Sequence, residues 1–217
     1  MGSPVTGLRE RKKIQTRTRI AATAMGLFAA RGFDEVTVAE IAAAAEVGVT
    51  TVFNYFPTKE DLFYDRQAEV IQHLSRVVGG RGPGESFADA CRRDMLELIA
   101  ARDWRAGLAE NIADFYRLID RSPALQARAR LMSDLATPHL AVTIADQLAI
   151  PSDDIVAVAT AATLTAIRNS LLGQARRESF AGTPVETIAE RLAIATARAF
   201  ALLDTELTTL GAPTGDA

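Results

Sequence analysis

Signals that begin and end α-helices recur along the whole chain, and they constrain its fold more than any other feature. Apolar residues repeat at helical spacing over 20–28, and Gly32 follows them as a stop signal. Ser122-Pro123 places a capping residue before a proline that suits the first position of a helix. No stretch sustains the period-two alternation of branched residues that is typical of strands. These patterns predict an all-α protein.

Two capping boxes predict where individual helices begin. Thr37 is followed three residues later by Glu40, so its hydroxyl can accept a bond from the Glu40 N–H while the Glu40 carboxylate returns to the cap. Thr183, Pro184 and Glu186 repeat the arrangement near the end of the chain. We therefore expect one helix to begin after Thr37 and another after Thr183.

The composition agrees with closely packed helices. Alanine supplies 40 of the 217 residues, whereas aromatic residues make up only 6%, so small aliphatic side chains must form the core. One cysteine (Cys91) and two histidines (His73 and His139) exclude a disulfide framework and argue against a Cys/His zinc site. The longest uncharged run, 155–167, is too short to span a membrane, and the first 15 residues contain no apolar leader. We expect a cytoplasmic protein without metal, cofactor or membrane.

The helix signals divide the chain into about nine helices. The first ends before Gly32, and the cluster from Gly79 to Gly84 is the clearest break. Pro138 is expected to kink or split the helix that contains it. The other predicted helices are 38–45, 49–55, 58–78, 87–102, 105–120, 124–149, 153–178 and 185–210.

Charge is distributed unevenly along the chain. Residues 1–31 carry a net charge of +6, whereas the remaining residues sum to −9. A basic end on an acidic body suggests contact with a polyanion at that end. A solvated, partly frayed terminus is the alternative that charge alone leaves open.

Residues 38–55 carry the strongest functional signal. A short helix, a break at Gly48 and a second short helix are typical of a helix-turn-helix, whose second helix lies in the major groove of DNA. Ala42 permits close approach of the two helices, and Val52 fills the angle between them. Two such helices also occur in bundles that never bind nucleic acid, so the segment alone leaves both interpretations open.

Hydroxyl and basic residues around this segment favour DNA binding. The basic run precedes it by one helix, where it can follow the phosphate backbone. Tyr55 and Lys59 flank the exit of the second helix. Small hydroxyl residues occupy helix starts, where they can bind phosphates together with backbone N–H groups: Thr37, Thr50, Thr51 and Thr58.

These residues also carry a family resemblance. Gly32-Phe33, the capped segment 37–45 and the segment 52–62 (VFNYFPTKEDL) resemble the DNA-binding domain of TetR-family transcriptional regulators, over about residues 14–65. The chain departs from the family pattern at Glu46, where glycine is common, and at Phe53, where a tyrosine often contacts phosphate. The resemblance implies a helix-turn-helix domain over 1–58 and a helical ligand-binding and dimerisation domain over 59–217.

The resemblance also implies roles for single residues. Asn54 can form paired hydrogen bonds with adenine, and Val49 offers an apolar surface to a base. Helix capping is the alternative role for each threonine. The DNA-binding set comprises Arg17, Thr37, Thr51, Tyr55 and Lys59 for the backbone and Val49, Thr50 and Asn54 for base edges.

For residues after 59, the resemblance implies a homodimer formed by the last two helices and a pocket for a small apolar or amphipathic effector. The protein is then a repressor released from a palindromic operator. A DNA- or partner-binding regulator that needs no ligand is the alternative. A closed cavity above ~300 Å³ would favour the ligand-responsive repressor, and a filled interior would favour the regulator without a ligand. No set of residues suggests an enzyme. Pocket candidates, each of which has a core or surface role as its alternative, are Trp104, Phe115, Tyr116, Met132, His139 and Asn169.

Overall fold

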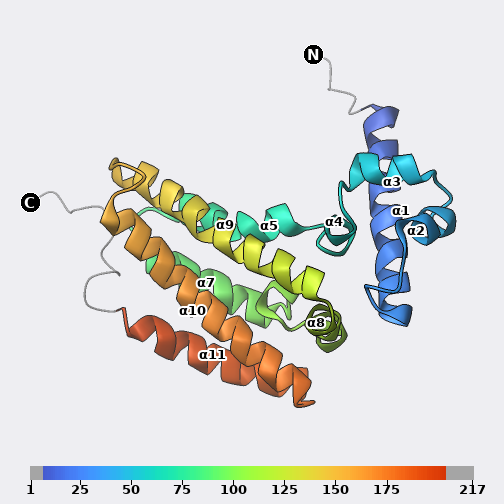
Figure 1. The fold of residues 1–217 in the computed structure, drawn as a ribbon. Coiled ribbons are helices and arrows are strands. Elements are labelled where there is room, and N and C mark those ends of the chain that lie inside the picture. Colours follow the sequence, from blue (N-terminus) through green and yellow to red (C-terminus); the bar gives the residue numbers. More distant parts are fainter. Residues whose placement is uncertain (1–6, 204–217) are drawn as a thin grey trace, which may run out of the picture. The chain divides into compact units, whose positions relative to one another are not determined.

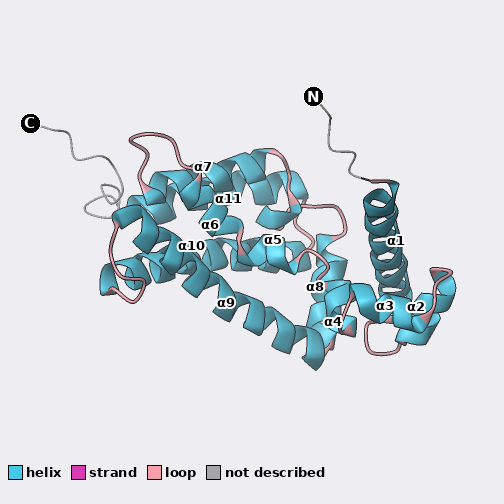
Figure 2. Ribbon diagram, turned by 90° about the horizontal axis from the view of Figure 1, so that it is seen from above, coloured by secondary structure: helices cyan, strands magenta, loops and turns pink. Residues whose placement is uncertain are grey.

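The computed structural model describes residues 7–203, and all regular elements in that range are helices (Figure 2). The all-α prediction is therefore confirmed, with more and shorter helices than expected. In chain order (Figure 1) the elements are α1 Leu8–Arg31, α2 Val38–Ala44, α3 Val49–Tyr55, α4 Lys59–Phe63, α5 Gln67–Ile71, α6 His73–Gly79, α7 Phe87–Ala100, a 3-10 turn Trp104–Ala106, α8 Ile112–Arg121, α9 Pro123–Leu148, α10 Ile155–Phe180 and α11 Val185–Ala201.

The chain packs as two compact units. Unit 1 comprises residues up to Gln67 together with Arg117–Arg128, and unit 2 comprises Ala68–Tyr116 and the residues from Ala129 onward. This division by packing differs from the predicted division into 1–58 and 59–217, because unit 1 extends to Gln67 and a later segment returns to it. The predicted functional division stays a prediction.

Aromatic and branched side chains form the core of unit 1, in which α2 and α3 lie beside α1 (Figures 1 and 2). The rings of Phe28 and Phe33 have centroids 4.9 Å apart, and Phe63 lies 6.2 and 6.0 Å from them. Ile41 of α2 and Val52 of α3 are completely buried. Burial of these side chains supplies the main driving force that holds α3 in place.

Residues 117–128 complete unit 1 through polar contacts. The Tyr64 hydroxyl donates to the Leu125 carbonyl at 3.0 Å, and the Ser122 hydroxyl donates to the Asp34 carboxylate at 2.9 Å. Arg128 forms an ion pair with Asp61, which is only 7% exposed. Burial raises the pKa of Asp61, but bonds from Thr58 and the charge of Arg128 outweigh it, so the pKa lies below its ordinary value.

The predicted helix over 58–78 is wrong as one element. Thr58 and Asp61 form a capping box that begins α4. The helix nevertheless ends at Phe63, since Tyr64 adopts φ −98° and ψ 46° while its hydroxyl bonds to Leu125. The chain turns again before α6, so three short helices replace one long helix.

Three further expectations need correction. The helix predicted over 105–120 begins only at Ile112, because Gly107 adopts a left-handed φ of 73° after the 3-10 turn. Pro138 lies inside α9, so the helix is not split there, and the kink stays a prediction. The second capping box does not form: Pro184 caps α11 without a side-chain bond, and Glu186 instead pairs with Arg102. The helix ends at Ala201, short of the predicted 210, and of the predicted extension the residues after 203 lie outside the described range.

Unit 2 is a bundle in which α11 packs against both α7 and α10. Phe87, Leu140 and Leu192 are completely buried, and so are Ala157 and Ala161 of α10. Small side chains at such positions allow helix axes to approach closely, as the alanine content predicted.

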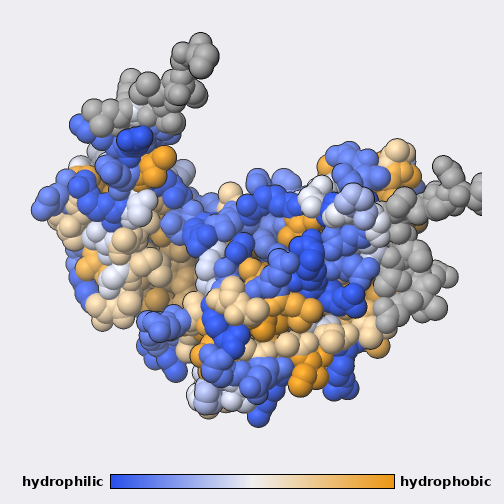
Figure 3. Space-filling view, turned by 180° about the vertical axis from the view of Figure 1, so that it is seen from behind, coloured by the Kyte–Doolittle hydropathy of each residue, from blue (hydrophilic) through white to orange (hydrophobic). Residues whose placement is uncertain are grey.

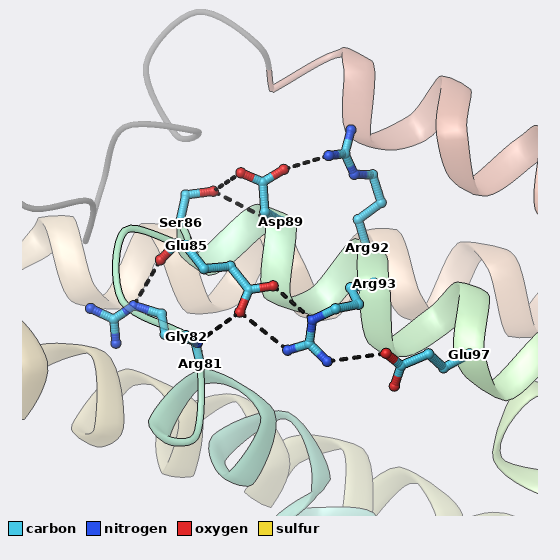
Figure 4. A network of polar contacts seen from close by, with 8 residues as sticks. All are labelled: Arg81, Gly82, Glu85, Ser86, Asp89, Arg92, Arg93 and Glu97. Atoms are coloured by element: carbon cyan, nitrogen blue, oxygen red, sulfur yellow. Dashed lines mark hydrogen bonds and ion pairs between the residues drawn. The ribbon is translucent and has the colours of Figure 1, made fainter.

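A polar network fixes the start of α7 (Figure 4). The Ser86 hydroxyl accepts from the Asp89 N–H at 3.0 Å. Arg93 pairs with Glu85 at 2.7 Å and with Glu97 at 3.4 Å. The bond from Arg93 lowers the pKa of Glu85. This network borders an open groove of about 650 Å³ between α7 and α11, so most of the groove's charged lining residues are already paired with one another.

Candidate nucleic-acid interface

The helix-turn-helix begins with the capping box that the sequence predicted. The Glu40 N–H donates to the Thr37 hydroxyl oxygen at 3.3 Å, and the Thr37 N–H donates to the Glu40 carboxylate at 2.8 Å. Arg31, at the end of α1, pairs with the same carboxylate at 2.7 Å. Bonds from Thr37 and Arg31 lower the pKa of Glu40 to about 2. The start of α2 is thereby tied to the end of α1.

The turn between α2 and α3 requires a left-handed residue. Glu46 occupies this position with φ 55°, where glycine is common in the resembling family. The Val47 N–H then donates to the Ala42 carbonyl at 3.0 Å and closes the turn. Gly48 caps α3 without a side-chain bond, as expected for glycine.

Helix α3 has one buried side and one open side. Val52 is completely buried, whereas Val49 is 41% exposed and Phe53 is 47% exposed. Thr50 and Asn54 are also exposed, one helical turn apart. These four open positions are spaced three and four residues apart, so they share one face. That face presents the three predicted base-reading residues, Val49, Thr50 and Asn54, together.

Basic residues line the exposed surface of α1. Arg11, Lys12, Lys13 and Arg19 are all exposed. Thr51 and Tyr55 of α3 are half-buried. Unit 1 therefore combines a helix with a free polar face and exposed cations that can follow a phosphate backbone.

Three predicted phosphate contacts are already bonded within unit 1. The Lys59 ammonium donates to the carbonyls of Phe33 at 2.9 Å and Val36 at 3.1 Å and lies 4.3 Å from the Phe33 ring centroid. Arg17 donates to the Asp65 carbonyl at 2.8 Å and covers the Phe56 ring. The Thr37 hydroxyl donates to Glu40. Each of these three side chains thus stabilises unit 1. The sequence had suggested such a structural role, helix capping, only for Thr37.

Not all of the six predicted pocket residues are buried. Met132 is buried, and the rings of Phe115 and Tyr116 pack 6.2 Å apart. His139 on α9 and Asn169 on α10 are exposed. Trp104 lies in the 3-10 turn and is partly buried. Sequence spacing alone did not reveal which of them face the interior of the bundle.

Sequence reasoning missed a polar cluster inside unit 2. Arg168 of α10, Asp94 and Cys91 of α7 border one small cavity, and His73 of α6 pairs with Asp94 at 2.8 Å. The available signal was the position of Arg168 directly after the uncharged run 155–167, within an apolar helix. Among the described residues, no three His, Cys, Asp or Glu side chains form a metal site.

A unit whose short second and third helices meet at a tight turn, with one face of the third helix open, has the geometry of a helix-turn-helix. Residues 20–64 match the family described as bacterial regulatory proteins, tetR family. This segment of the chain is therefore a helix-turn-helix DNA-binding domain of the TetR type. The match covers the helix-turn-helix, where the sequence resemblance was found.

Relatives and solved structures agree with this family. The HTH-type transcriptional regulator TcmR of Streptomyces glaucescens is 29% identical over 153 residues, 68% of this chain and 67% of that protein. The HTH-type transcriptional regulator LuxR of Vibrio harveyi is 41% identical over 63 residues, 29% of each chain. The crystal structure of NalD, a secondary repressor of the MexAB-OprM multidrug efflux pump in Pseudomonas aeruginosa, shares the fold with a TM-score of 0.55 and 20% identity, covering 85% of this chain and 96% of NalD.

Proposed function

We propose that this regulator is a cytoplasmic homodimeric repressor that binds a palindromic operator through α3 and is released by a small amphipathic ligand. The exposed face of α3 beside the cations of α1 carries the DNA-binding part of the proposal. A single recognition helix contacts only a few base pairs. Two copies about 34–36 Å apart recognise a longer and therefore more specific DNA site.

Exposed apolar side chains on α10 and α11 support the dimer. Ile155 is 75% exposed, Ile194 is 63% exposed and Leu202, directly after α11, is 84% exposed. Helix α10 is long and apolar enough to cross a membrane by length and composition, yet only 33% of its most apolar window is buried. A second copy packed on α10 and α11 would cover this surface and bury more than ~1,200 Å².

The fold shared with NalD supports repression as the direction of regulation. NalD, which shares the fold, is described as a repressor. TcmR and LuxR are described as regulators without a stated direction. Repression also needs nothing beyond occupancy of the operator, whereas activation needs a surface that recruits a partner.

The size of the cavity inside unit 2 limits which ligand can bind there without a conformational change. The enclosed cavity beside Arg168 has a volume of about 10 Å³. A preformed site for a drug-sized molecule needs ~300 Å³ or more, so a ligand at this place must separate the surrounding helices. The small cavity favours the alternative function, a regulator that needs no ligand, whereas the part-buried charges of Asp94 and Arg168 beside it favour a ligand site.

Selection of duplexes from a random DNA pool by the full chain tests the DNA-binding proposal. A palindromic consensus with half-sites about one helical turn apart is the expected result. Sedimentation should show a dimer that Ile194→Glu dissociates, whereas Leu135→Glu, an exposed leucine of α9, should leave it intact. A monomer that binds the selected site tightly would contradict the proposal.

A screen for compounds that release the selected duplex separates the two candidate functions. Release at a defined concentration, with saturation, supports the ligand-responsive repressor. If no compound releases the duplex and helix separation is never detected, the regulator acts without a ligand.

A further inference from the structure

Arg168 lies in an environment that leaves part of its guanidinium without a partner. Its Nη2 donates to the Arg105 carbonyl at 3.2 Å. Its Nε is shielded from solvent and has no hydrogen-bond partner. Within the described part of the chain, no carboxylate lies within ion-pair distance of it. Burial lowers the pKa of Arg168, and arginine stays charged even so.

Asp94 attracts the Arg168 charge without forming an ion pair with it. The Asp94 carboxylate borders the same cavity and is bonded to His73 at 2.8 Å, so it leaves the Arg168 Nε without a partner. Burial raises the pKa of the Cys91 thiol to about 12, so the thiol is neutral near pH 7. Thr165, one turn before Arg168 on α10, also has a buried hydroxyl without a partner.

The remaining lining of the cavity is apolar. It consists of one residue from α6, one from α7, one from α10 and one from the end of α11: Leu74, Met95, Leu164 and Phe200. A volume of about 10 Å³ is at the lower limit for one water molecule, so no organic molecule fits without displacing these side chains. Methionine and leucine side chains repack readily, which makes such displacement feasible.

We propose that Arg168 anchors the acidic group of an effector, and that the effector is a small amphipathic acid whose apolar body packs against Leu74, Met95 and Phe200. This inference deepens the proposed function and rests on it. A carboxylate can bond side-on to the Nε and Nη2 edge of a guanidinium through two parallel hydrogen bonds. Nε is free to donate, and at Nη2 the acid would replace the long bond to Arg105.

A purely structural role for Arg168 is the rival explanation. Its bond to Arg105 ties α10 to the 3-10 turn, and its charge attracts Asp94. On that account, removing the guanidinium changes stability but not the selectivity of any ligand. Comparing the binding of an acid with that of its uncharged amide therefore distinguishes the two explanations.

Calorimetric titration of the full-length dimer with two acid and amide pairs tests the inference. The probes are 2-naphthoate with 2-naphthamide and decanoate with decanamide, which match in shape and differ in charge. At least one acid should bind about 10-fold or more tightly than its amide, as expected for hydrogen bonds to a charged group. Equal binding of acid and amide, or binding of neither acid, would overturn the inference.

Variants of Arg168 test whether this residue causes the preference for the acid over the amide. Arg168→Met, which keeps the length and apolar stem, should reduce the acid preference to within twofold, and Arg168→Lys should retain part of it. Arg177→Met changes an exposed arginine of the same helix and should leave the preference unchanged. If Arg168→Met does not fold, Arg168→Lys and the wild-type acid-to-amide ratio still decide the question. An acid preference that survives either folded Arg168 variant unaltered would refute the assignment.

Operator release separates this inference from the proposed function. An acid that binds through Arg168 without releasing the operator supports the site and contradicts ligand release. A neutral compound that releases the operator equally from the wild type and Arg168→Met supports ligand release and overturns the acid site.

Discussion

Replacing Lys59 with methionine distinguishes two roles of its ammonium group. The sequence predicted that Lys59 binds phosphate, and the structure bonds it to the carbonyls of Phe33 and Val36 and places it 4.3 Å from the Phe33 ring centroid. We expect Lys59→Met to loosen the corner between α1 and α2, because the carbonyls of two buried residues, Phe33 and Val36, lose a charged donor. The first effect should therefore be on stability.

The magnitude follows from the contacts. A hydrogen bond to a charged group contributes about 1.5–3 kcal/mol, and an exposed cation–π contact about 0.5–1 kcal/mol. Loss of one such hydrogen bond together with the cation–π contact gives an expected loss of about 2–4 kcal/mol. For a chain of this size each kcal/mol corresponds to roughly 2–4 °C, which predicts a fall in Tm of about 4–16 °C.

Thermal melting by circular dichroism and the salt dependence of operator binding form the assay. Each neutralised phosphate contributes about 0.9 to the slope of log K against log salt concentration. Lys59→Met should lower Tm and leave this slope unchanged, whereas Lys13→Met, an exposed lysine of α1, should lower the slope without changing Tm. An unchanged Tm with a slope reduced by about 0.9 would refute the structural role of Lys59.

Further predictions concern acid stability, thiol reactivity and base reading. Because folding lowers the pKa of Glu40 from 4.5 to about 2, its stabilising effect should be present above pH 4.5 and be lost as the pH falls toward 2; the Tm difference between wild type and Glu40→Gln should therefore shrink in that window. Cys91, whose pKa is raised to about 12 by burial, should resist iodoacetamide at pH 8 in the native protein and react rapidly in urea, and equal rates would contradict its burial. Asn54→Ala should change the preferred operator sequence, whereas Tyr55→Phe should weaken binding to all sequences about equally; selection of duplexes by each variant measures both, and an unchanged consensus with Asn54→Ala would contradict the base-reading role.

Local signals predicted the helix-turn-helix well because its ends are set by neighbouring residues. The capping box of Thr37 and Glu40 and the cap at Gly48 act within one helical turn, so the sequence contains both partners. The open face of α3 follows from the same spacing, with Val52 inward and Asn54 outward. Such elements need no knowledge of distant contacts.

Helix ends and side-chain clusters that depend on residues far away in the chain could not be predicted from the sequence. The helix break at Tyr64 accompanies a hydrogen bond from its hydroxyl to Leu125, 61 residues later. Glu186 does not form the predicted capping box and instead bonds to Arg102, 84 residues earlier. The cluster around Arg168 likewise joins α6, α7 and α10. Periodicity identifies which residues can be inside a bundle, but it does not say which inward residues of different helices meet.

Glu46 offers a test of the turn that positions α3. A residue with a Cβ atom at φ 55° carries a cost of about 1–2 kcal/mol relative to glycine, partly offset by the greater flexibility of glycine in the unfolded chain, which costs about 0.4–1 kcal/mol. Glu46→Gly should therefore raise Tm, by a few degrees at most, relative to Glu46→Ala, the control that removes the same charge but keeps the Cβ. Glu46→Val should lower Tm below that of the alanine variant, because branched residues tolerate this conformation least. The comparison isolates backbone strain from charge, since all three variants lack the carboxylate. If glycine and valine melt at the same temperature as alanine, the left-handed residue does not strain the turn, and the departure from the family pattern at this position has no energetic consequence.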